Sequence, residues 1–331
     1  MARGGALMLS LNSFLAEAIR RFIALRRLSG TDYHSQALLL AAFDRFVAAH
    51  ALGEEPQQLS RQLLEAYQQS LSALAPRTQA NRMCVVRQLC RYLAARDPCV
   101  FVPEPVRAIP SPGAHVPYLY THEEVQALLA GAATLPPPGS LRPHAIATVL
   151  GLLYSTGLRI GEALALNLGD FYPGEQRLFI AAGKFHKARW IPLAPSVCQA
   201  LADYLQRRLQ LLPQGPQAPL FVNLRGHRLH HGSVNQDFHR LLAHCGIARG
   251  QHASPRLQDF RHTFSITRLL AWYREGCDVN ARLPALATYL GHVDITSTHC
   301  YLHPTAELLA QVQQRFHSHY LNHVKPQGGA Q

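Results

Sequence analysis

The sequence lacks the features that mark several large classes of protein. Its seven cysteines form no C-x-x-C pair, and no H-E-x-x-H motif accompanies its 19 histidines, so neither a disulfide framework nor a metal site is predicted. The longest apolar run, Ala145 to Leu158, is too short to span a bilayer. No loop ends in G-K-[ST], which excludes a P-loop. We therefore expect a cytoplasmic chain without metal, cofactor or membrane span.

Acidic residues are also scarce. The 331 residues include 20 Asp and Glu against 32 Lys and Arg, which gives a formal net charge of +12. Arginine binds phosphate oxygens in a bidentate way, and a positive potential speeds encounter with nucleic acid. The balance favours a polyanionic partner, although charge alone also fits a protein that binds membrane surfaces.

The length exceeds what one hydrophobic core usually organises, so we expect two domains. Apolar residues recur at helical spacing in four N-terminal segments, which are Leu11 to Arg27, Tyr33 to His50, Leu59 to Leu74 and Arg77 to Ala95. The spacing predicts a helical domain over residues 1–98. A proline-rich stretch follows at 99–117 and is typical of a linker, because proline lacks an amide donor.

Residues 118–331 form the second predicted domain. Thr121 and Glu124 have capping-box spacing, and Gly157 separates a long apolar helix from another helix near Leu158. Two β-prone runs, 178–182 and 189–193, indicate a hairpin, and the remainder is predicted to be mainly helical to about Tyr320. The expected fold is mainly α with a small β-hairpin or sheet.

Five residues of this domain carry candidate chemistry, namely Arg159, Lys184, Arg261, His292 and Tyr301. Cleavage of a phosphodiester needs a nucleophile, a proton acceptor, a proton donor for the leaving oxygen, and positive charge around the phosphoryl oxygens. One tyrosine, two arginines, a lysine and a histidine meet these needs without a metal.

The segments around these residues resemble the boxes of the tyrosine recombinase, or phage integrase, family. YSTGLRIGEALAL from Tyr154 is similar to its first arginine box, GKFHKARWIPL from Gly183 to its lysine box, and LQDFRHTF from Leu257 to its second arginine box. YLGH from Tyr289 and THCY ending at Tyr301 are similar to the remaining box. The resemblance implies a helical core-binding domain followed by a mixed α+β catalytic domain.

The resemblance also implies a role for each residue. Arg159 and Arg261 would hold the non-bridging oxygens of the scissile phosphate, and His292 would add a hydrogen bond. Tyr301 would attack phosphorus to form a 3′-phosphotyrosyl link, and Lys184 would protonate the leaving 5′-oxygen.

Two further residues are linked to this set. Glu162, nearly one helical turn after Arg159, is expected to support that arginine, and Lys187 is the alternative to Lys184.

One position departs from the family pattern. Gln258 stands where the family has a histidine, three residues before Arg261. Glutamine can hydrogen-bond a phosphate but cannot shuttle a proton. Activity is therefore expected to be reduced, conditional or shared with a partner, and His252 and His262 are weaker candidates to substitute.

The expected partner is double-stranded DNA carrying specific recombination sites. Arg77, Arg82 and Arg87 of the N-terminal domain, with Lys187, are the predicted DNA contacts. The resemblance implies a tetramer on DNA, nucleoid association and transposition or integration of a mobile element. Residues after Pro304 are candidates for contact between subunits, and a partner recombinase is an open alternative.

Two other functions share these residues. An enzyme similar to type IB topoisomerases would use the same Tyr301 chemistry to relax supercoils. A DNA-binding accessory factor without strong catalysis is the other alternative, motivated by Gln258.

Overall fold

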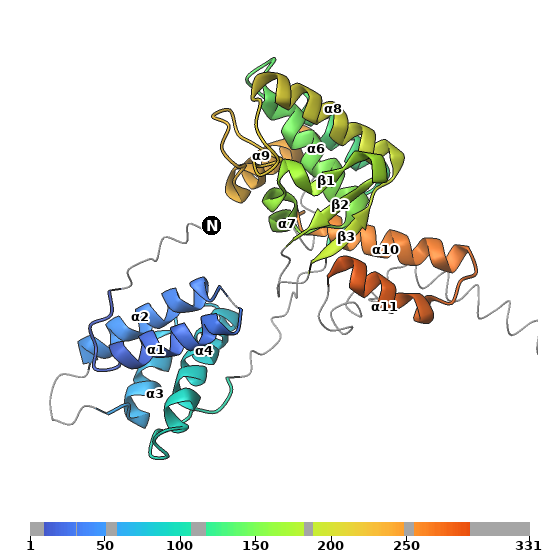
Figure 1. Ribbon diagram of the computed structural model, residues 1–331. Helices are drawn as coiled ribbons and strands as arrows, with labels where there is room; N and C mark the ends of the chain where they lie inside the picture. The colour runs from blue at the N-terminus through green and yellow to red at the C-terminus, as the bar shows by residue number, and fades with distance from the viewer. Residues whose placement is uncertain are drawn as a thin grey trace, which may run out of the picture. The chain divides into compact units, whose positions relative to one another are not determined.

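The chain divides into two compact units, Met1–Ala114 and His115–Gln331, seen in the computed structural model in Figure 1. The structure describes residues 10–30, 32–50, 58–106, 117–181, 188–247 and 255–291. Both units are mainly helical, and the second also contains a small three-stranded sheet. The predicted fold class is therefore confirmed.

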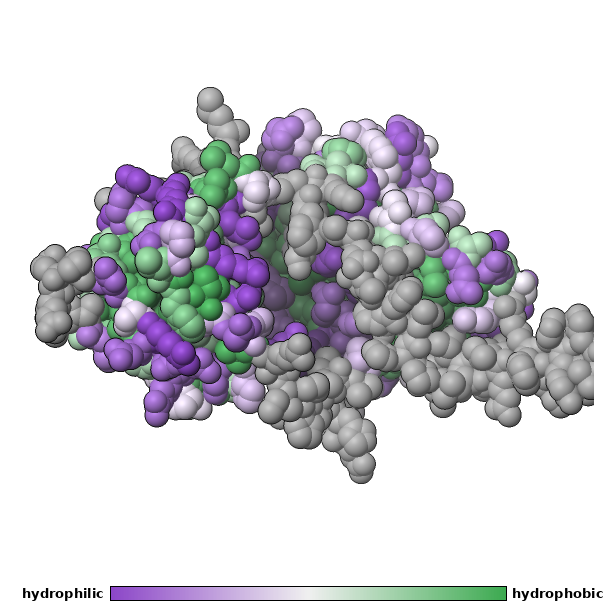
Figure 2. Space-filling model, turned by 90° about the horizontal axis from the view of Figure 1, so that it is seen from below, coloured by the Kyte–Doolittle hydropathy of each residue, from purple (hydrophilic) through white to green (hydrophobic). Residues whose placement is uncertain are grey.

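The N-terminal unit contains four described helices, and most begin close to the predicted positions. They are α1 (Ala16–Leu28), α2 (His34–His50), α3 (Arg61–Ser70) and α4 (Pro76–Ala94). Their apolar faces meet in one core, in which Ile19, Leu40, Phe43, Leu64 and Leu89 are almost fully buried. Figure 2 shows a face of this unit on which hydrophilic residues border a hydrophobic patch.

The start of α1 differs from the prediction. The helix begins at Ala16 rather than Leu11, and a buried carboxylate on α2 binds the residues that precede it. Asp44 accepts hydrogen bonds from the backbone N–H of Asn12 at 2.7 Å and from the hydroxyl of Ser13 at 2.5 Å.

The C-terminal unit places its helices around α6 (Leu141–Thr156), which packs against α5 (His122–Ala132), α7 (Ile160–Ala165), α8 (Pro195–Leu211) and α10 (Asp259–Arg274). Buried residues run the whole length of α6, from Leu141 to Thr156, whereas His144 is exposed and Thr148 is half-buried. The end of α6 therefore lies in the interior of the unit. The other helices are α9 (His231–His244) and α11 (Val279–Leu290).

The predicted capping box is confirmed at the start of α5. The Thr121 hydroxyl accepts the backbone N–H of Glu124 at 3.2 Å, and the Glu124 carboxylate accepts the N–H of Thr121 at 2.9 Å.

The sheet has the order β1-β2-β3 with antiparallel pairing throughout, and the strands are β1 (Phe171–Tyr172), β2 (Arg177–Ile180) and β3 (Arg189–Pro192). Pairing of Leu178 with Ile191 confirms that the two predicted runs are partners. Strand β1 and the 3₁₀ turns beside it, Leu168–Asp170 and Pro173–Glu175, were not predicted. A strand of two residues is too short to show an alternating pattern.

Candidate active site

Gly157 ends α6 and turns the chain toward the candidate site. Its φ of 63° lies in the left-handed region, where glycine is favoured because it has no Cβ. A Cβ at this position would lie 2.6 Å from Cδ1 of Phe264. Glycine is thus required by the backbone angle and by the packing, and the turn places Arg159 just before α7.

Arg159 and Glu162 form the first pair of the site. The Glu162 carboxylate accepts the backbone N–H of Arg159 at 3.1 Å and its Nη1 at 3.1 Å. The Arg159 side chain is 25% exposed, whereas the Glu162 side chain is buried. The carboxylate therefore fixes both the start of α7 and the direction of the Arg159 guanidinium.

Arg189, the first residue of β3, binds the same carboxylate from the other side. Its Nη1 and Nη2 donate to the two oxygens of Glu162 at 3.2 and 2.9 Å, and its Nε donates to the carbonyl of Tyr289 at 2.8 Å. Sequence reasoning did not select this arginine. Its one signal was its place in the segment that resembles the lysine box.

The two arginines keep Glu162 ionised. Burial by itself raises the pKa of this carboxyl, but the hydrogen bond and charge of Arg189, with those of Arg159, outweigh burial and leave the pKa below its ordinary value. The three side chains therefore form a charged cluster with one net positive charge.

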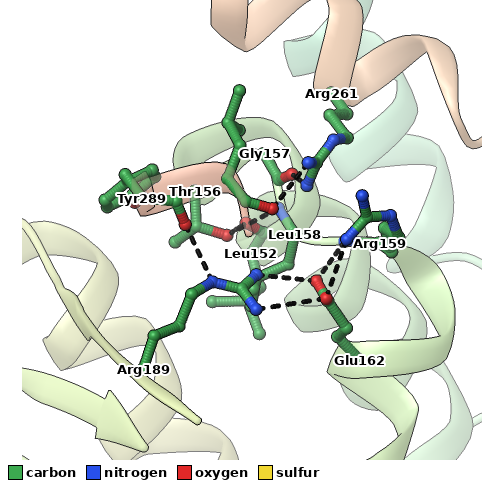
Figure 3. Close-up of polar contacts among 10 residues, drawn as sticks. Leu152, Thr156, Gly157, Leu158, Arg159, Glu162, Arg189, Arg261 and Tyr289 are labelled. Atoms are coloured by element: carbon green, nitrogen blue, oxygen red, sulfur yellow. Dashed lines mark hydrogen bonds and ion pairs between the residues drawn. The ribbon is translucent and has the colours of Figure 1, made fainter. Parts of the chain in front are cut away.

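Arg261 on α10 joins two helix ends next to this cluster. Its Nη1 donates to the carbonyl of Gly157 at 2.9 Å and its Nη2 to the carbonyl of Leu290 at 2.6 Å. The residue is 1% exposed. Figure 3 shows that Arg261, Arg159 and Arg189 converge on the turn between α6 and α7.

The C-terminal end of α11 is held by two arginines. The carbonyls of Tyr289 and Leu290 accept from Arg189 and Arg261 respectively. Gly291 follows with a φ of 69°, and a Cβ there would lie 2.8 Å from Nη1 of Arg189. The end of α11 thus has no room for a side chain at Gly291 while Arg189 keeps this position.

Tyr289 contributes its carbonyl to the site, and its side chain is half-buried. Burial raises the pKa of Tyr289 to about 12, although the charges of Arg268, Arg189 and Arg261 oppose the rise. The phenol therefore stays protonated at neutral pH.

The structure brings together three of the predicted site residues, Arg159, Glu162 and Arg261. Gln258 is exposed just before α10, where its carbonyl accepts the backbone N–H of Arg261 at 3.1 Å, and His262 is half-buried on α10. The other predicted residues of the site lie outside the described residues: Lys184, Lys187, His252, His292 and Tyr301.

The three predicted DNA-contacting arginines of α4 differ in exposure. Arg77 is exposed and Arg82 is half-buried. Arg87 is also half-buried, and its Nε donates to the carbonyl of Pro103 at 2.8 Å. Arg77 is therefore the most accessible of the three to a ligand.

In the described part of the chain, no group of three His, Cys, Asp or Glu side chains is placed to hold a metal ion. None of the helices in these ranges is long and apolar enough to cross a membrane.

The chain is similar in sequence to known proteins. The model of the phage integrase family matches residues 119–307, which is more than half of the chain. The protein y4rB of Sinorhizobium fredii, named as an integrase or recombinase, is 35% identical over 92% of this chain and 97% of its own. Tyrosine recombinase XerD of Caulobacter vibrioides is 34% identical over 80% of this chain and 84% of its own.

A solved structure has the same fold. The Tn1549 transposon integrase in complex with transposon right end DNA superposes with a TM-score of 0.63 at 18% identity, covering 90% of this chain and 98% of that one. The fold and the matched sequence define an enzyme of DNA strand breakage and rejoining, a tyrosine recombinase. The chain belongs to the phage integrase family.

Proposed function

We propose that this protein is a site-specific recombinase of a mobile element, which cuts and rejoins DNA through a 3′-phosphotyrosyl link at Tyr301. The observation that carries the proposal is the convergence of Arg159, Arg189 and Arg261 on the turn between α6 and α7, where the Glu162 carboxylate pairs with the first two. Three guanidinium groups and one carboxylate leave two positive charges in excess, which suits the binding of an anionic phosphodiester.

In the proposed reaction, the phenolic oxygen of Tyr301 loses its proton to solvent and attacks phosphorus while the bond from phosphorus to the 5′-oxygen breaks. Lys184 gives its proton to the departing 5′-oxygen, with Lys187 as the alternative donor. Arg159 and Arg261 neutralise the non-bridging oxygens, and His292 donates a further hydrogen bond to them. Attack by a 5′-hydroxyl on the phosphotyrosyl link reverses the reaction, so no cofactor is consumed.

The two arginines enter this mechanism unequally. The Arg159 side chain is partly exposed and already oriented by Glu162, whereas Arg261 is 1% exposed and donates to two main-chain carbonyls. We therefore assign the first contact with the phosphate to Arg159. Direct contact with Arg261 requires a rearrangement around that residue when DNA binds.

The proposed organisation assigns the helical region 1–98 to DNA binding, 99–117 to a linker and 118–331 to catalysis. Arg77 is the accessible member of the proposed DNA contacts on α4, which also include Arg82 and Arg87. The recombinase and integrase names of the relatives support the reaction class, and the transposon origin of the Tn1549 enzyme supports a mobile element. A tetramer on nucleoid DNA, with subunit contacts by residues after Pro304, completes the proposal.

One observation favours a second candidate, a DNA-binding accessory factor. Gln258 precedes Arg261 by one helical turn and is exposed there, but its amide cannot transfer a proton as a histidine would. In this alternative the chain binds the recombination site and a partner recombinase supplies the cleavage.

Covalent capture on a nicked duplex separates the two candidates. The duplex is the fragment that the wild-type protein retains most strongly from a library of its own genomic DNA, with a nick placed at each phosphate in turn. When the nick lies just 3′ of the cleaved phosphate, the short product with a 5′-hydroxyl diffuses away and the phosphotyrosyl complex persists on a denaturing gel.

We expect capture by the wild type and none by Tyr301→Phe, although both bind the unnicked duplex equally. Specific binding without capture, with capture appearing in Gln258→His, would instead establish the accessory factor.

A further inference from the structure

We propose that Arg189 is a positioning residue of this active site, which sets Arg159 and the end of α11 in the arrangement that cleavage requires. The inference rests on the proposed function, because it concerns the same phosphodiester cleavage. In the proposed role, Arg189 does not contact the reacting atoms and acts through Glu162 and Tyr289.

The first contact sets the direction of Arg159. Both terminal nitrogens of Arg189 donate to Glu162, at 3.2 and 2.9 Å, and the same carboxylate accepts from Arg159 at 3.1 Å. A bidentate pair fixes the plane of a carboxylate as well as its distance. Glu162 therefore presents its oxygens to Arg159 in one orientation, and that orientation depends on Arg189.

The second contact sets the end of α11. Nε of Arg189 donates to the carbonyl of Tyr289 at 2.8 Å, two residues before Gly291. The backbone of Gly291 passes so close to Arg189 that an added Cβ would meet its Nη1 at 2.8 Å. His292 is the next residue in the sequence, so Arg189 holds the described backbone directly before the predicted histidine.

The position of Arg189 in the chain adds a third link. It begins β3, and only Ala188 separates it from residue 187, the last residue of the segment that contains Lys184 and Lys187. One side chain thus connects the strand that follows the lysine segment to Glu162 on α7 and to the end of α11. The hydrogen bonds span 27 and 100 residues of sequence.

A gain in stability alone does not explain why Arg189 pairs with Glu162. A buried ion pair loses hydration on both partners, and replacing both by neutral groups often leaves stability unchanged. A double substitution therefore tests whether the loss of cleavage rate follows the loss of stability. Arg189→Gln leaves Glu162 with one arginine fewer, whereas Arg189→Gln with Glu162→Gln removes both partners and leaves neutral amides of similar shape.

The test measures single-turnover cleavage of the nicked duplex at saturating protein, well below the melting temperature of every variant. We expect Arg189→Gln to bind the duplex as the wild type does and to cleave it about a hundredfold more slowly, which is the scale of loss for a misplaced reacting group. The double variant should recover thermal stability but not the rate. Arg177→Gln, on the neighbouring strand β2, is the matched control and should cleave at the wild-type rate.

A sulfur substrate shows which part of the chemistry depends on Arg189. When sulfur replaces the bridging 5′-oxygen, Tyr301 attacks phosphorus, the phosphorus–sulfur bond breaks and the sulfur leaves as a thiolate without needing a proton. The phenolic proton passes to solvent. This substrate should restore cleavage to Lys184→Ala but not to Arg189→Gln, because Arg189 acts on the phosphate-binding side.

Three results would overturn the positioning role: wild-type cleavage by Arg189→Gln, recovery of the rate in the double variant, or rescue of Arg189→Gln by sulfur. Absence of capture by the wild type itself would remove the proposed function, and this proposal with it. If the wild type cleaves the duplex and Arg189→Gln cleaves it slowly, the proposed function stands and the result bears only on the role of Arg189.

Discussion

Arginine serves different purposes in the two units of the molecule. In the N-terminal unit, Arg21 and Arg61 are 65% and 69% exposed and pair with glutamates one helical turn away. In the C-terminal unit, Arg261 is buried, the Arg189 side chain is 9% exposed, and both donate to main-chain carbonyls at helix ends. Exposed pairs add little stability and leave their charge available to a polyanion, whereas the buried arginines fix the backbone.

The division has exceptions, which make it testable. In the N-terminal unit, Arg20, Arg27 and Arg87 also donate to carbonyls, those of Leu11, Asp32 and Pro103. The net charge of +12 therefore combines arginines that can attract DNA with arginines that hold the fold. Substitution of an arginine that attracts DNA should change DNA binding, whereas substitution of an arginine that holds the fold should change stability.

The largest expected effect is the loss of stability in Arg261→Met. The substitution removes the donors to the carbonyls of Gly157 and Leu290, and each buried acceptor left unpaired costs about 1–3 kcal/mol. We expect the free energy of unfolding to fall by about 2–6 kcal/mol in urea denaturation. Arg21→Met is the exposed counterpart and should change it by less than about 0.5 kcal/mol. Equal losses of stability in Arg261→Met and Arg21→Met would contradict the contrast between buried and exposed arginines.

Gly157→Ala should have the next largest effect. Its φ of 63° is costly for alanine, and the added Cβ would press on Phe264. A loss of about 1–3 kcal/mol is expected from the backbone strain. Gly161→Ala, four residues away, is the control, because nothing lies within 4 Å of its added Cβ and alanine favours a helix. Thermal unfolding should show a lower melting temperature for the first variant and an unchanged or higher one for the second.

A smaller effect, on binding rather than stability, is expected for Arg77→Gln. Because Arg77 is exposed on α4, its loss should leave unfolding unchanged and reduce the slope of log affinity against log salt by about 1. Arg87→Gln should also lower stability, since it frees the Pro103 carbonyl. DNA titrations at several salt concentrations, beside melting curves, measure both. An unchanged salt slope for Arg77→Gln would remove it from the DNA contacts.

The smallest effect concerns pH. Burial opposes the ionisation of Glu162, but Arg189 and Arg159 hold its pKa below the usual 4.5. The native state therefore binds this proton more weakly than the unfolded chain does, so the contribution to stability is present above pH 4.5 and lost as pH falls through the lowered pKa. The stability difference between wild type and Glu162→Gln should shrink across that acidic range. A difference that grows on acidification would contradict the lowered pKa.

Local patterns predicted local structure. The Thr121 capping box and the pairing of the two β-prone runs needed only neighbouring residues or a short hairpin, and the structure confirms both. The predicted start of α1 was wrong, because the residues before Ala16 lie outside the helix and are bound by Asp44, 32 residues after Asn12. No local pattern signals such a contact.

The site shows the same limit. The pairing of Glu162 with Arg159 could be expected from their spacing of three residues in a helix. The contacts of Arg189 with Glu162 and Tyr289 could not, because they depend on how β3, α7 and α11 pack together. The roles of Lys184, His292 and Tyr301 stay predictions for the experiments described above.

Trp190 is an intrinsic fluorescent reporter of the molecule. The Arg177 guanidinium stacks on its indole, 3.8 Å from the ring centroid. Trp190 adjoins Arg189 in β3, and Trp272, the other tryptophan of the chain, lies on α10 beside Arg282. Residues 1–114 contain no tryptophan, so the emission arises entirely from the unit that holds the candidate site. Changes in this fluorescence when DNA is added would follow events at β3 and α10 without any attached dye.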